Sequence, residues 1–199
     1  MNPTIKARIE SIRRGGVPEG YKRTKIGIVP NEWNVESLKS HLIEYRHLSN
    51  DIDKFDIYSS SRNGLMLQSA YYSQKTATQT NLGYKTVPNG YVTYRHMSDD
   101  DIFHFNINRQ NKTILVSAEY PVFDTDDQTN TYFLITYLNS MARFRYFCRG
   151  QKMGGTRTRL YFNVLGDFKL AFPSISEQEK IAEILAGQDR VIALKEELL

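Results

Sequence analysis

The sequence FPSISEQEKIAEIL, residues 172–185, contains the strongest local structural signal in the chain. Ser176, followed three residues later by Glu179, forms the pattern of an N-terminal capping box. Apolar residues then recur every three or four positions, which predicts an amphipathic helix that continues to the end of the chain. Gln188 interrupts the apolar stripe, and one polar residue in a coiled-coil seam can fix its register. We expect this helix to pack through Ile181, Ile184, Leu185, Gln188, Val191, Ile192 and Leu198.

Two interpretations of this stripe are open. The helix covers the core of its own chain, or it pairs as a coiled coil with a helix of another chain. The stripe is still running at the last residue, which favours a partner outside the chain.

Upstream of the helix, the apolar pattern between residues 55 and 125 has a period of two, which is typical of β-strands. Asn63-Gly64 is a turn signal between two strand-like runs. Residues 84–87 and 91–95 flank Pro88-Asn89-Gly90 and are predicted to pair as a hairpin. Further strands are predicted at 113–117, 120–123 and 168–172.

Two more helices are predicted. Residues 4–14 form a short helix with Thr4 as N-cap, and residues 131–148 form a longer one with apolar side chains on one face. These elements predict an α+β fold, in which a globular domain with a mixed β-sheet and flanking helices precedes a C-terminal amphipathic helix of the coiled-coil type. We expect an N-terminal helix and connector in 1–20, the globular domain in 21–173 and the packing helix in 174–199.

The composition is that of one globular domain. The chain has 199 residues, of which 40% are hydrophobic and 24% charged, so a packed core is expected. The single cysteine, Cys148, excludes a disulfide framework. No apolar run approaches the roughly 18 residues of a membrane helix, and the basic N-terminal region lacks the apolar segment of a secretory signal. A cytoplasmic protein is therefore expected.

The charges are segregated along the chain, although the net charge is only +4. Residues 1–25 carry seven basic and two acidic side chains, and residues 143–160 carry six basic side chains and no acid. Residues 176–199 are acidic, and further acids cluster at 99–101 and 124–127. The basic block at 143–160 suits a surface that binds a polyanion. The alternative is a solvated face whose basic residues pair with the acidic clusters.

Motifs for catalysis and cofactors are weak or missing. The sequence has no glycine fingerprint for a dinucleotide or S-adenosylmethionine, and no phosphate-binding loop. The four histidines and Cys148 lack zinc-site spacing. The one enzymatic pattern is that of a metal-dependent nuclease, in which Asp126 or Asp127 would act with Asp167 and Lys169. This pattern is short, so we expect no catalytic residues, no metal and no cofactor.

At the C-terminal helix the sequence resembles the specificity (S) subunit of Type I restriction–modification systems. Pro173 precedes a Glu-Gln-x-Lys-Ile-Ala-x-Ile-Leu run at 177–185, and Asp189 and Ile192 follow, as in that family. Other segments resemble the family in the same order: Pro30 to Trp33 with Leu38, Gly64-Leu65, Tyr84-Lys85-x-Val87-x-x-Gly90, Val116-Ser117-x-x-Tyr120-x-Val122-Phe123 and Gly155-Thr156-Arg157. The resemblance covers residues 17–199. One departure is Tyr91 after Gly90, where the family usually has Asp.

This resemblance implies a non-catalytic subunit that recognises a specific sequence in double-stranded DNA. In the family, two target recognition domains joined by antiparallel helices each read half of a split target. Methylation and cleavage belong to separate methyltransferase (M) and restriction (R) subunits, and S-adenosylmethionine binds the M subunit. With one recognition domain, this chain resembles half an S subunit, which is expected to form a homodimer through its C-terminal helix. The alternative is an assembly module that docks an M subunit and has no useful DNA affinity alone.

The residues expected to contact DNA fall into two groups. Phosphate contacts are expected from the glycine-rich basic segment, through Arg149, Lys152, Gly154, Gly155, Thr156, Arg157 and Arg159. Base edges are expected to be read from three places: the 69–75 loop, residues 95–96 and the turn before Asn63. The side chains in these places are Tyr71, Tyr72, Gln74, Lys75, Arg95, His96 and Arg62.

Overall fold

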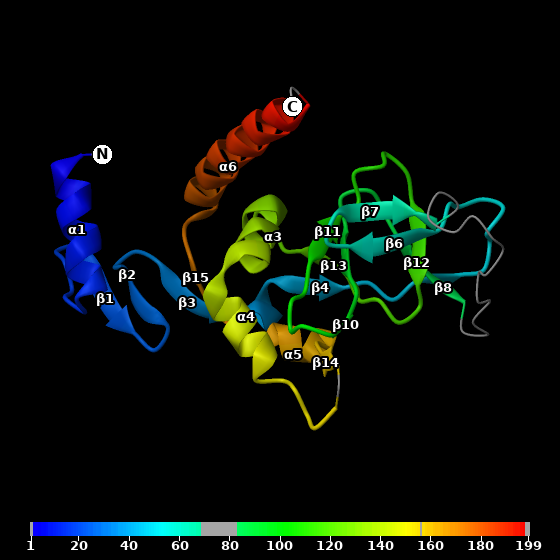
Figure 1. Ribbon diagram of the computed structural model, residues 1–199, viewed down its shortest axis with the longest axis horizontal. Coiled ribbons are helices and arrows are strands. Elements are labelled where there is room, and N and C mark those ends of the chain that lie inside the picture. Colours follow the sequence, from blue (N-terminus) through cyan, green and yellow to red (C-terminus); the bar gives the residue numbers. More distant parts are fainter. Residues whose placement is uncertain (1, 69–82, 156, 198–199) are drawn as a thin grey trace.

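A short helix begins the chain, a long run of strands follows, and most of the helices lie toward the C-terminal end (Figure 1). The computed structural model describes residues 2–68, 83–155 and 157–197. Antiparallel sheets and helices are combined in this part of the chain, which confirms the predicted α+β class.

Two sheets form the centre of the body. The first is antiparallel in the order β11-β9-β13-β4, with β4 (Leu42–Glu44), β9 (Val92–Tyr94), β11 (Phe105–Ile107) and β13 (Val122–Thr125). The second has the order β12-β8-β5, with β5 (Leu48–Ser49), β8 (Tyr84–Val87) and β12 (Ile114–Ser117). Val122 of the first sheet shares a buried cluster with Val87, Ile114 and Val116 of the second, so apolar packing joins the two sheets.

Four strand pairs complete the sheet structure of the described residues. They are β1 (Tyr21–Thr24) with β2 (Gly27–Pro30), β3 (Asn34–Ser37) with β15 (Lys169–Phe172), β6 (Tyr58–Ser61) with β7 (Gly64–Leu67), and β10 (Met97–Ser98) with β14 (Thr158–Arg159). The predicted turn at Asn63-Gly64 is confirmed, because it joins β6 to β7. Gly64 has a φ of +102°, which a residue without a Cβ adopts at little cost.

The predicted hairpin between residues 84–87 and 91–95 is wrong. β8 pairs with β12 and β5, whereas β9 pairs with β11 and β13. A turn does exist, since the Tyr91 N–H donates to the Pro88 carbonyl at 3.2 Å. However, the Asn108 side chain donates to the Val87 carbonyl at 2.8 Å, and the Asn108 carbonyl accepts from the Gly90 N–H at 2.7 Å. These hydrogen bonds occupy the backbone groups of Val87 and Gly90 beside the turn. The two strands therefore do not pair with each other, and each pairs with other strands of the chain.

The predicted single helix over 131–148 is two helices, α3 (Thr131–Ser140) and α4 (Ala142–Arg149). Met141 between them is extended, with a ψ of 124°. Asn139 anchors the end of α3, because its side chain accepts from the Phe105 N–H at 2.9 Å and donates to the Phe105 carbonyl at 3.0 Å. The break lets α4 turn Phe144 and Cys148 into the core independently of α3.

Two predicted helix caps are shifted by two residues. The N-terminal helix α1 (Pro3–Arg13) begins after Asn2, whose side chain accepts from the Thr4 N–H, so Asn2 and not Thr4 is the N-cap. The long helix α6 (Ile175–Glu196) has its capping box at Ser174 and Glu177 and not at Ser176 and Glu179. Ser174 is the last residue with extended backbone, so its side chain alone can reach the free N–H groups of the first turn.

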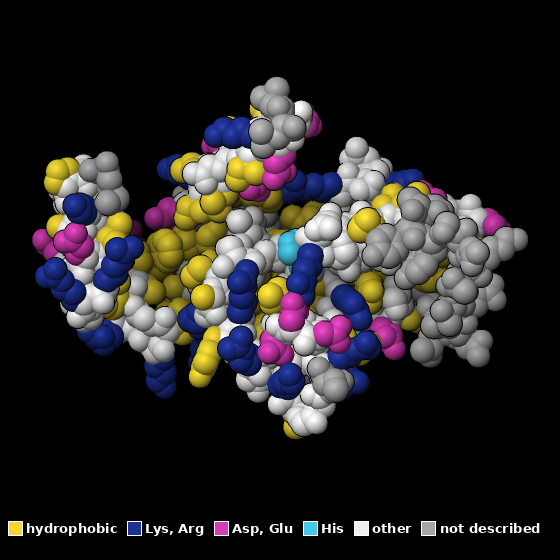
Figure 2. Space-filling model, in the orientation of Figure 1, with side chains coloured by type: hydrophobic (Ala, Val, Ile, Leu, Met, Phe, Trp, Pro, Cys, Tyr) yellow, Lys and Arg dark blue, Asp and Glu magenta, His cyan; other side chains and the backbone are white. Residues whose placement is uncertain are grey.

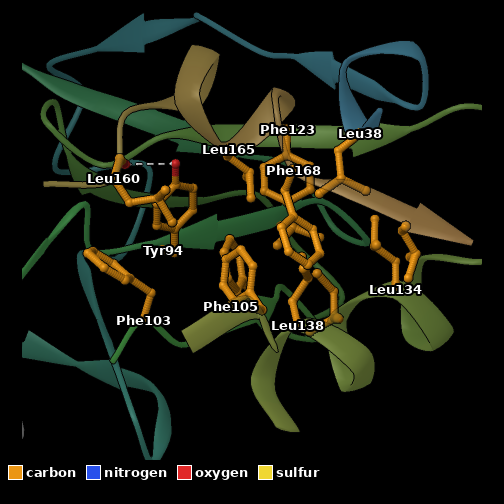
Figure 3. Close-up of a cluster of buried hydrophobic side chains, with 14 of the residues drawn as sticks. Leu38, Tyr94, Phe103, Phe105, Phe123, Leu134, Leu138, Leu160, Leu165 and Phe168 are labelled. Atoms are coloured by element: carbon orange, nitrogen blue, oxygen red, sulfur yellow. Dashed lines mark hydrogen bonds between the residues drawn. The ribbon is translucent and has the colours of Figure 1, made fainter. Parts of the chain in front are cut away.

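The main core lies between the first sheet and the helices (Figure 3). The ring centroid of Phe105 lies 4.6 Å from that of Tyr94 and 5.7 Å from that of Phe144, and the Phe144 and Phe168 rings meet edge to face at 5.0 Å. The Tyr94 hydroxyl donates to the Leu160 carbonyl at 3.0 Å, which satisfies the one polar atom of this buried ring. Helix α5 (Phe162–Gly166) and the 3-10 turn η1 (Leu38–Ser40) contribute Leu165 and Leu38 to this core.

Two helices contribute little to this core. Helix α1, with the β1–β2 pair, lies at one end of the molecule and has no buried residue. Helix α6 leaves the body beside α3, and its only buried residues are Gln178 and Ala182 (Figure 1). In the described part of the chain, no helix combines the length and apolarity that a bilayer crossing requires.

Candidate nucleic-acid interface

The pairing of β10 with β14 brings two charged segments of the chain together. Met97 lies opposite Arg159, and Ser98 lies opposite Thr158. As a result, the acidic residues that follow β10 lie against the basic residues that precede and form β14. Basic side chains gather on this face of the molecule with acidic side chains among them, below α3 and around α4 and β14 (Figure 2).

We call this surface the basic face and define it by six predicted DNA contacts: Arg62, Arg95, Arg149, Lys152, Arg157 and Arg159. All six residues are exposed. They come from three separate segments of the chain. Arg62 lies in the β6–β7 turn, Arg95 precedes β10, and the other four lie between the end of α4 and β14. Arg62 and Arg95 come from two of the three places that were predicted to read base edges. The fold brings both beside residues 149–159, the segment that was predicted to bind phosphates.

Three of these cations are already paired with acids. The acidic turn, which we define as Asp99, Asp100 and Asp101, follows β10 directly. Arg157 Nε donates to Asp99 Oδ1 at 2.8 Å, and Arg149 Nε lies 3.7 Å from Asp101 Oδ2. Arg62 forms an ion pair with Asp100. Pairing of basic residues with an acidic cluster, one of the two alternatives for the charged segments, therefore applies to half of the basic face.

The other half of the basic face is unpaired within the described residues. Arg95, Lys152 and Arg159 form no ion pair with a described acid, although Thr158 and Leu160 on either side of Arg159 are buried. Gly154 and Gly155 are exposed between these cations, and a Cβ at Gly154 would meet no atom within 4 Å. Free guanidinium and ammonium groups beside an open backbone suit contacts with phosphate oxygens.

A cleft of about 720 Å³ opens beside the basic face. Arg62 and Arg95 line it, together with the serines of β6 and the side chain of His104. Burial lowers the pKa of His104, so its ring is neutral at pH 7. The cleft therefore offers two guanidinium groups, which can donate hydrogen bonds to base edges. The carboxylates of Asp99, Asp100 and Glu119 also line it, and the hydroxyls of Ser60 and Ser61 already donate to backbone carbonyls.

His96 does not belong to this surface. Its side chain is buried, and its ring stacks on Tyr161 at a centroid distance of 5.7 Å. Burial lowers its pKa, so the ring is uncharged at pH 7 and adds nothing to the positive potential. His96 is accordingly left out of the interface proposed below. Tyr71, Tyr72, Gln74, Lys75 and Thr156, the other predicted contacts, lie outside the described residues.

The residues predicted to pack α6 divide into two groups. Ile181 packs against the main core and Leu185 is half-buried, so the beginning of α6 covers its own chain. Ile184, Gln188, Val191 and Ile192 are exposed. Leu198 lies outside the described residues. Covering of its own core thus applies to the first part of the helix, and pairing of the exposed part with another chain stays a prediction.

Sequence reasoning missed Gln178, the residue that anchors α6. Its side chain is buried and accepts from the Asn130 N–H at 2.9 Å, and its amide donates to the Gln128 and Pro173 carbonyls, each at 3.0 Å. The available signal was its place in the Glu-Gln run. Burial of Gln178 was not predicted, because glutamine side chains are mostly exposed.

The residues of the nuclease pattern have other partners. Asp126 Oδ2 lies 3.2 Å from Nδ1 of the buried His41, whose Nε2 lies 3.2 Å from Glu36 Oε2. Asp167 caps the end of α5, and Lys169 is opposite Ser37 in the β15–β3 pair. Among the described residues, no group of three or more His, Cys, Asp or Glu side chains could hold a metal ion.

Comparisons with known proteins place this geometry in a family. Residues 46–199 match the family profile of the Type I restriction modification DNA specificity domain. The HsdS subunit from Thermoanaerobacter tengcongensis is 16% identical, with a TM-score of 0.52 over 98% of this chain and 49% of that chain. The S subunit of a Type I restriction–modification system from M. genitalium is 12% identical, with a TM-score of 0.51 over 79% of this chain and 39% of that chain.

A third solved structure comes from work on complex assembly and conformational transition of the type I R-M system. It is 15% identical, with a TM-score of 0.54 over 97% of this chain and 49% of that chain. The chain thus spans less than half the length of these solved chains, and at such identities they show likeness of fold. No curated protein matches the sequence. Because the family profile covers more than half of its residues, this chain belongs to the family of Type I restriction modification DNA specificity domains.

Proposed function

We propose that this chain is the DNA-reading part of a Type I restriction–modification specificity subunit and has no catalytic activity of its own. The observation that carries the proposal is the basic face, where Arg95, Lys152 and Arg159 are exposed without ion pairs to described residues. Neutralising DNA phosphates with such groups supplies much of the affinity of a DNA-binding protein. Membership of the DNA specificity domain family supports the same conclusion.

The two parts of the basic face suit different tasks. Arg159, Lys152 and the N–H groups of Gly154 and Gly155 are proposed to hold phosphates and so set the position of the duplex. Arg62 and Arg95 line the cleft and are proposed to reach base edges, since a guanidinium can donate two hydrogen bonds to guanine in the major groove.

The partners follow from the family. The chain is proposed to act in the cytoplasm by positioning M subunits, and through them R subunits, on a split DNA target. Methylation and cleavage would be carried out by those subunits, so this chain would need no cofactor.

Helix α6 is proposed to provide a homodimer contact. Ile184, Val191, Ile192 and Leu194 are between 52% and 63% exposed, which is unusual for a cluster of large apolar side chains on one helix. The segment 176–199 is acidic whereas residues 1–25 are basic. The apolar stripe favours contact of α6 with α6 or α1 of a second copy, and the opposite charges favour α1.

DNA binding is tested by fluorescence anisotropy of a labelled duplex of random sequence, titrated with the chain alone and in complex with its M subunit. Affinity should fall with salt, and Arg159→Ala should reduce the slope of log K against log salt by about 0.9, as expected for one lost phosphate contact. Lys180→Ala removes one exposed positive charge from α6 and is the control, for which the slope should not change. Equal slopes for both variants would reject the proposed contact.

The assembly module remains the second candidate function, because three of the six cations are occupied by the acidic turn. It predicts that the chain binds its M subunit while Arg95→Ala and Arg159→Ala leave the DNA affinity of the complex unchanged. DNA binding that depends on these two residues would exclude it.

The homodimer is tested by light scattering. Ile184→Asp with Val191→Asp places two charges on the exposed stripe one heptad apart and should convert a dimer to a monomer. Glu183→Gln, on the same helix, is the control that should keep the dimer. A wild-type chain that is monomeric both alone and with its M subunit would contradict the proposed contact.

A further inference from the structure

The acidic turn is a rigidly built structure. Ser98 Oγ donates to Asp100 Oδ1 at 2.8 Å and accepts from the Ile102 N–H at 3.1 Å, which closes the turn on itself. Asp101 has a φ of +64°, a conformation that few residues other than glycine adopt. The Asp101 carboxylate also accepts from the Thr158 hydroxyl, so the turn is tied to β14. The carboxylates of Asp100 and Asp101 are therefore held by the turn and by β14, whereas that of Asp99 bonds only to Arg157 among the described residues.

Each carboxylate of the turn holds an arginine from a different part of the chain. Asp100 holds Arg62 from the β6–β7 turn, Asp101 holds Arg149 at the end of α4, and Asp99 holds Arg157 before β14. Arg62 is distant in sequence from Arg149 and Arg157, which lie in one segment, and all three have the acidic turn as their common contact. The turn thus sets the relative positions of three of the six cations of the basic face.

The exposure of these ion pairs argues against a role in stability. The arginine side chains are 57%, 73% and 49% exposed at Arg62, Arg149 and Arg157. Exposed ion pairs contribute little to stability because water screens them. Three carboxylates on a face that binds DNA also repel phosphates, so their presence there needs another reason.

The geometry of the pairs leaves N–H donors of each arginine available to a ligand. Arg62 meets Asp100 through one terminal nitrogen, so its remaining N–H groups stay available. Arg157 and Arg149 face their aspartates through Nε. A guanidinium has five N–H donors in a planar fork, so its two terminal nitrogens stay available when Nε is engaged. A fixed fork of this kind loses less side-chain entropy on binding than a free arginine does.

We propose that the acidic turn determines the specificity of the proposed DNA interface. Its carboxylates orient Arg62, Arg149 and Arg157 and, by their charge, weaken binding to DNA that does not offer acceptors at the places where these arginines point. This inference rests on the proposed function and adds to it a selectivity device. The residues Asp99, Asp100 and Asp101 are positioning residues, because they act through the arginines.

Asp99→Asn is the most direct test. Asp99 is exposed and its side chain bonds only to Arg157 among the described residues, so the variant should fold, which circular dichroism checks. Glu119→Gln is the matched control, because Glu119 faces the same cleft but forms no ion pair with a described residue. Each variant loses one negative charge, and only the first one releases an arginine.

Two duplexes are used as probes: one selected from a random pool by the wild-type complex with its M subunit, and one of random sequence. Asp99→Asn should bind the random duplex about three- to tenfold more tightly at low salt, with a slope steeper by up to about one unit as Arg157 becomes free to meet phosphates. Its preference for the selected duplex should fall. Glu119→Gln should tighten binding to both duplexes equally, so its preference should stay at the wild-type value.

A double-mutant cycle assigns the effect to the pair. In an Arg157→Ala background, Asp99→Asn should no longer change the preference for the selected duplex. Equal preferences for Asp99→Asn, Glu119→Gln and the wild type would overturn the proposal while leaving DNA binding intact. A wild-type complex that binds neither duplex would overturn the proposed function itself, and this outcome differs from the former.

Discussion

The main core and the outer half of α6 contain the same kinds of side chain in opposite surroundings. Leu138 of α3 is 1% exposed within a ring of aromatic residues, whereas Leu194 of α6 is 59% exposed. The core residues have all their partners within this chain. The large apolar residues beyond Leu185 on α6, Val191, Ile192 and Leu194, stay more than half exposed in the folded chain. The difference separates residues that make the domain from residues whose surface is available to a partner.

The contact between helix α6 and the body of the domain involves few residues. Helix α6 has 22 residues, about 33 Å at the usual rise of an α-helix, and it contacts the body from its first turn as far as Asp189. Gln178 and Ala182 are buried, Ile181 packs on the core, and the Tyr132 hydroxyl donates to the Asp189 carboxylate from α3. An isolated helical stretch as short as the remainder is marginal in water, so a partner helix would stabilise it.

Leu138→Ala should show the largest effect, a loss of about 2–5 kcal/mol in the free energy of unfolding, because it leaves a cavity in the main core. Denaturant unfolding measures it. Cys148 provides a second readout, since burial raises the pKa of its thiol to about 12 and keeps it unreactive in the folded protein. Faster thiol labelling in the variant would report opening of the core; a loss below about 1 kcal/mol would mean that the core can be repacked.

Gln178→Ala should cost about 1–3 kcal/mol, because one backbone N–H and two carbonyls lose their partner in a buried place. Gln188→Ala is the control: the same substitution on the exposed part of the same helix should change stability by less than about 0.5 kcal/mol. Equal effects would mean that α6 is not anchored through Gln178.

Ser174→Ala should cost about 1 kcal/mol, as is usual for the loss of an N-cap. The same substitution at Ser176, which the sequence pattern favoured as the cap, should be nearly neutral, because Ser176 is already inside the helix. Thermal unfolding of the two variants decides between the two capping boxes, and a larger loss at Ser176 would place the helix start two residues later.

Leu194→Ala should show the smallest effect on the folded chain, less than about 0.5 kcal/mol, because its side chain is already in water. Compared with Leu138→Ala, the substitution is identical and only the surroundings differ. The effect should appear instead in the dimer, as weaker association in sedimentation experiments at low concentration. A large loss in the free energy of unfolding of the monomer would mean that Leu194 packs within its own chain, as Leu138 does.

The elements of this fold that depend on local pattern were predictable. The period of α6, the Asn-Gly turn between β6 and β7, and the strands at 114–117 and 169–172 follow from neighbouring residues alone. The pairing of β8 and β9 was not predictable in this way, since their partners lie elsewhere in the sequence. The break at Met141 likewise depends on Asn139 meeting the backbone of Phe105, which is 34 residues away.

The candidate site likewise has features that follow from adjacent residues and features that depend on contacts between distant ones. The segregated charges, the basic block at 143–160 and the apolar stripe of the C-terminal helix can be read from the sequence alone, because they are properties of adjacent residues. The contact of 99–101 with that block, and its pairing with Arg62, Arg149 and Arg157, depends on the three-dimensional fold. Asp99 and Arg157 are 58 positions apart, and their contact depends on the pairing of β10 with β14, which no local pattern specifies.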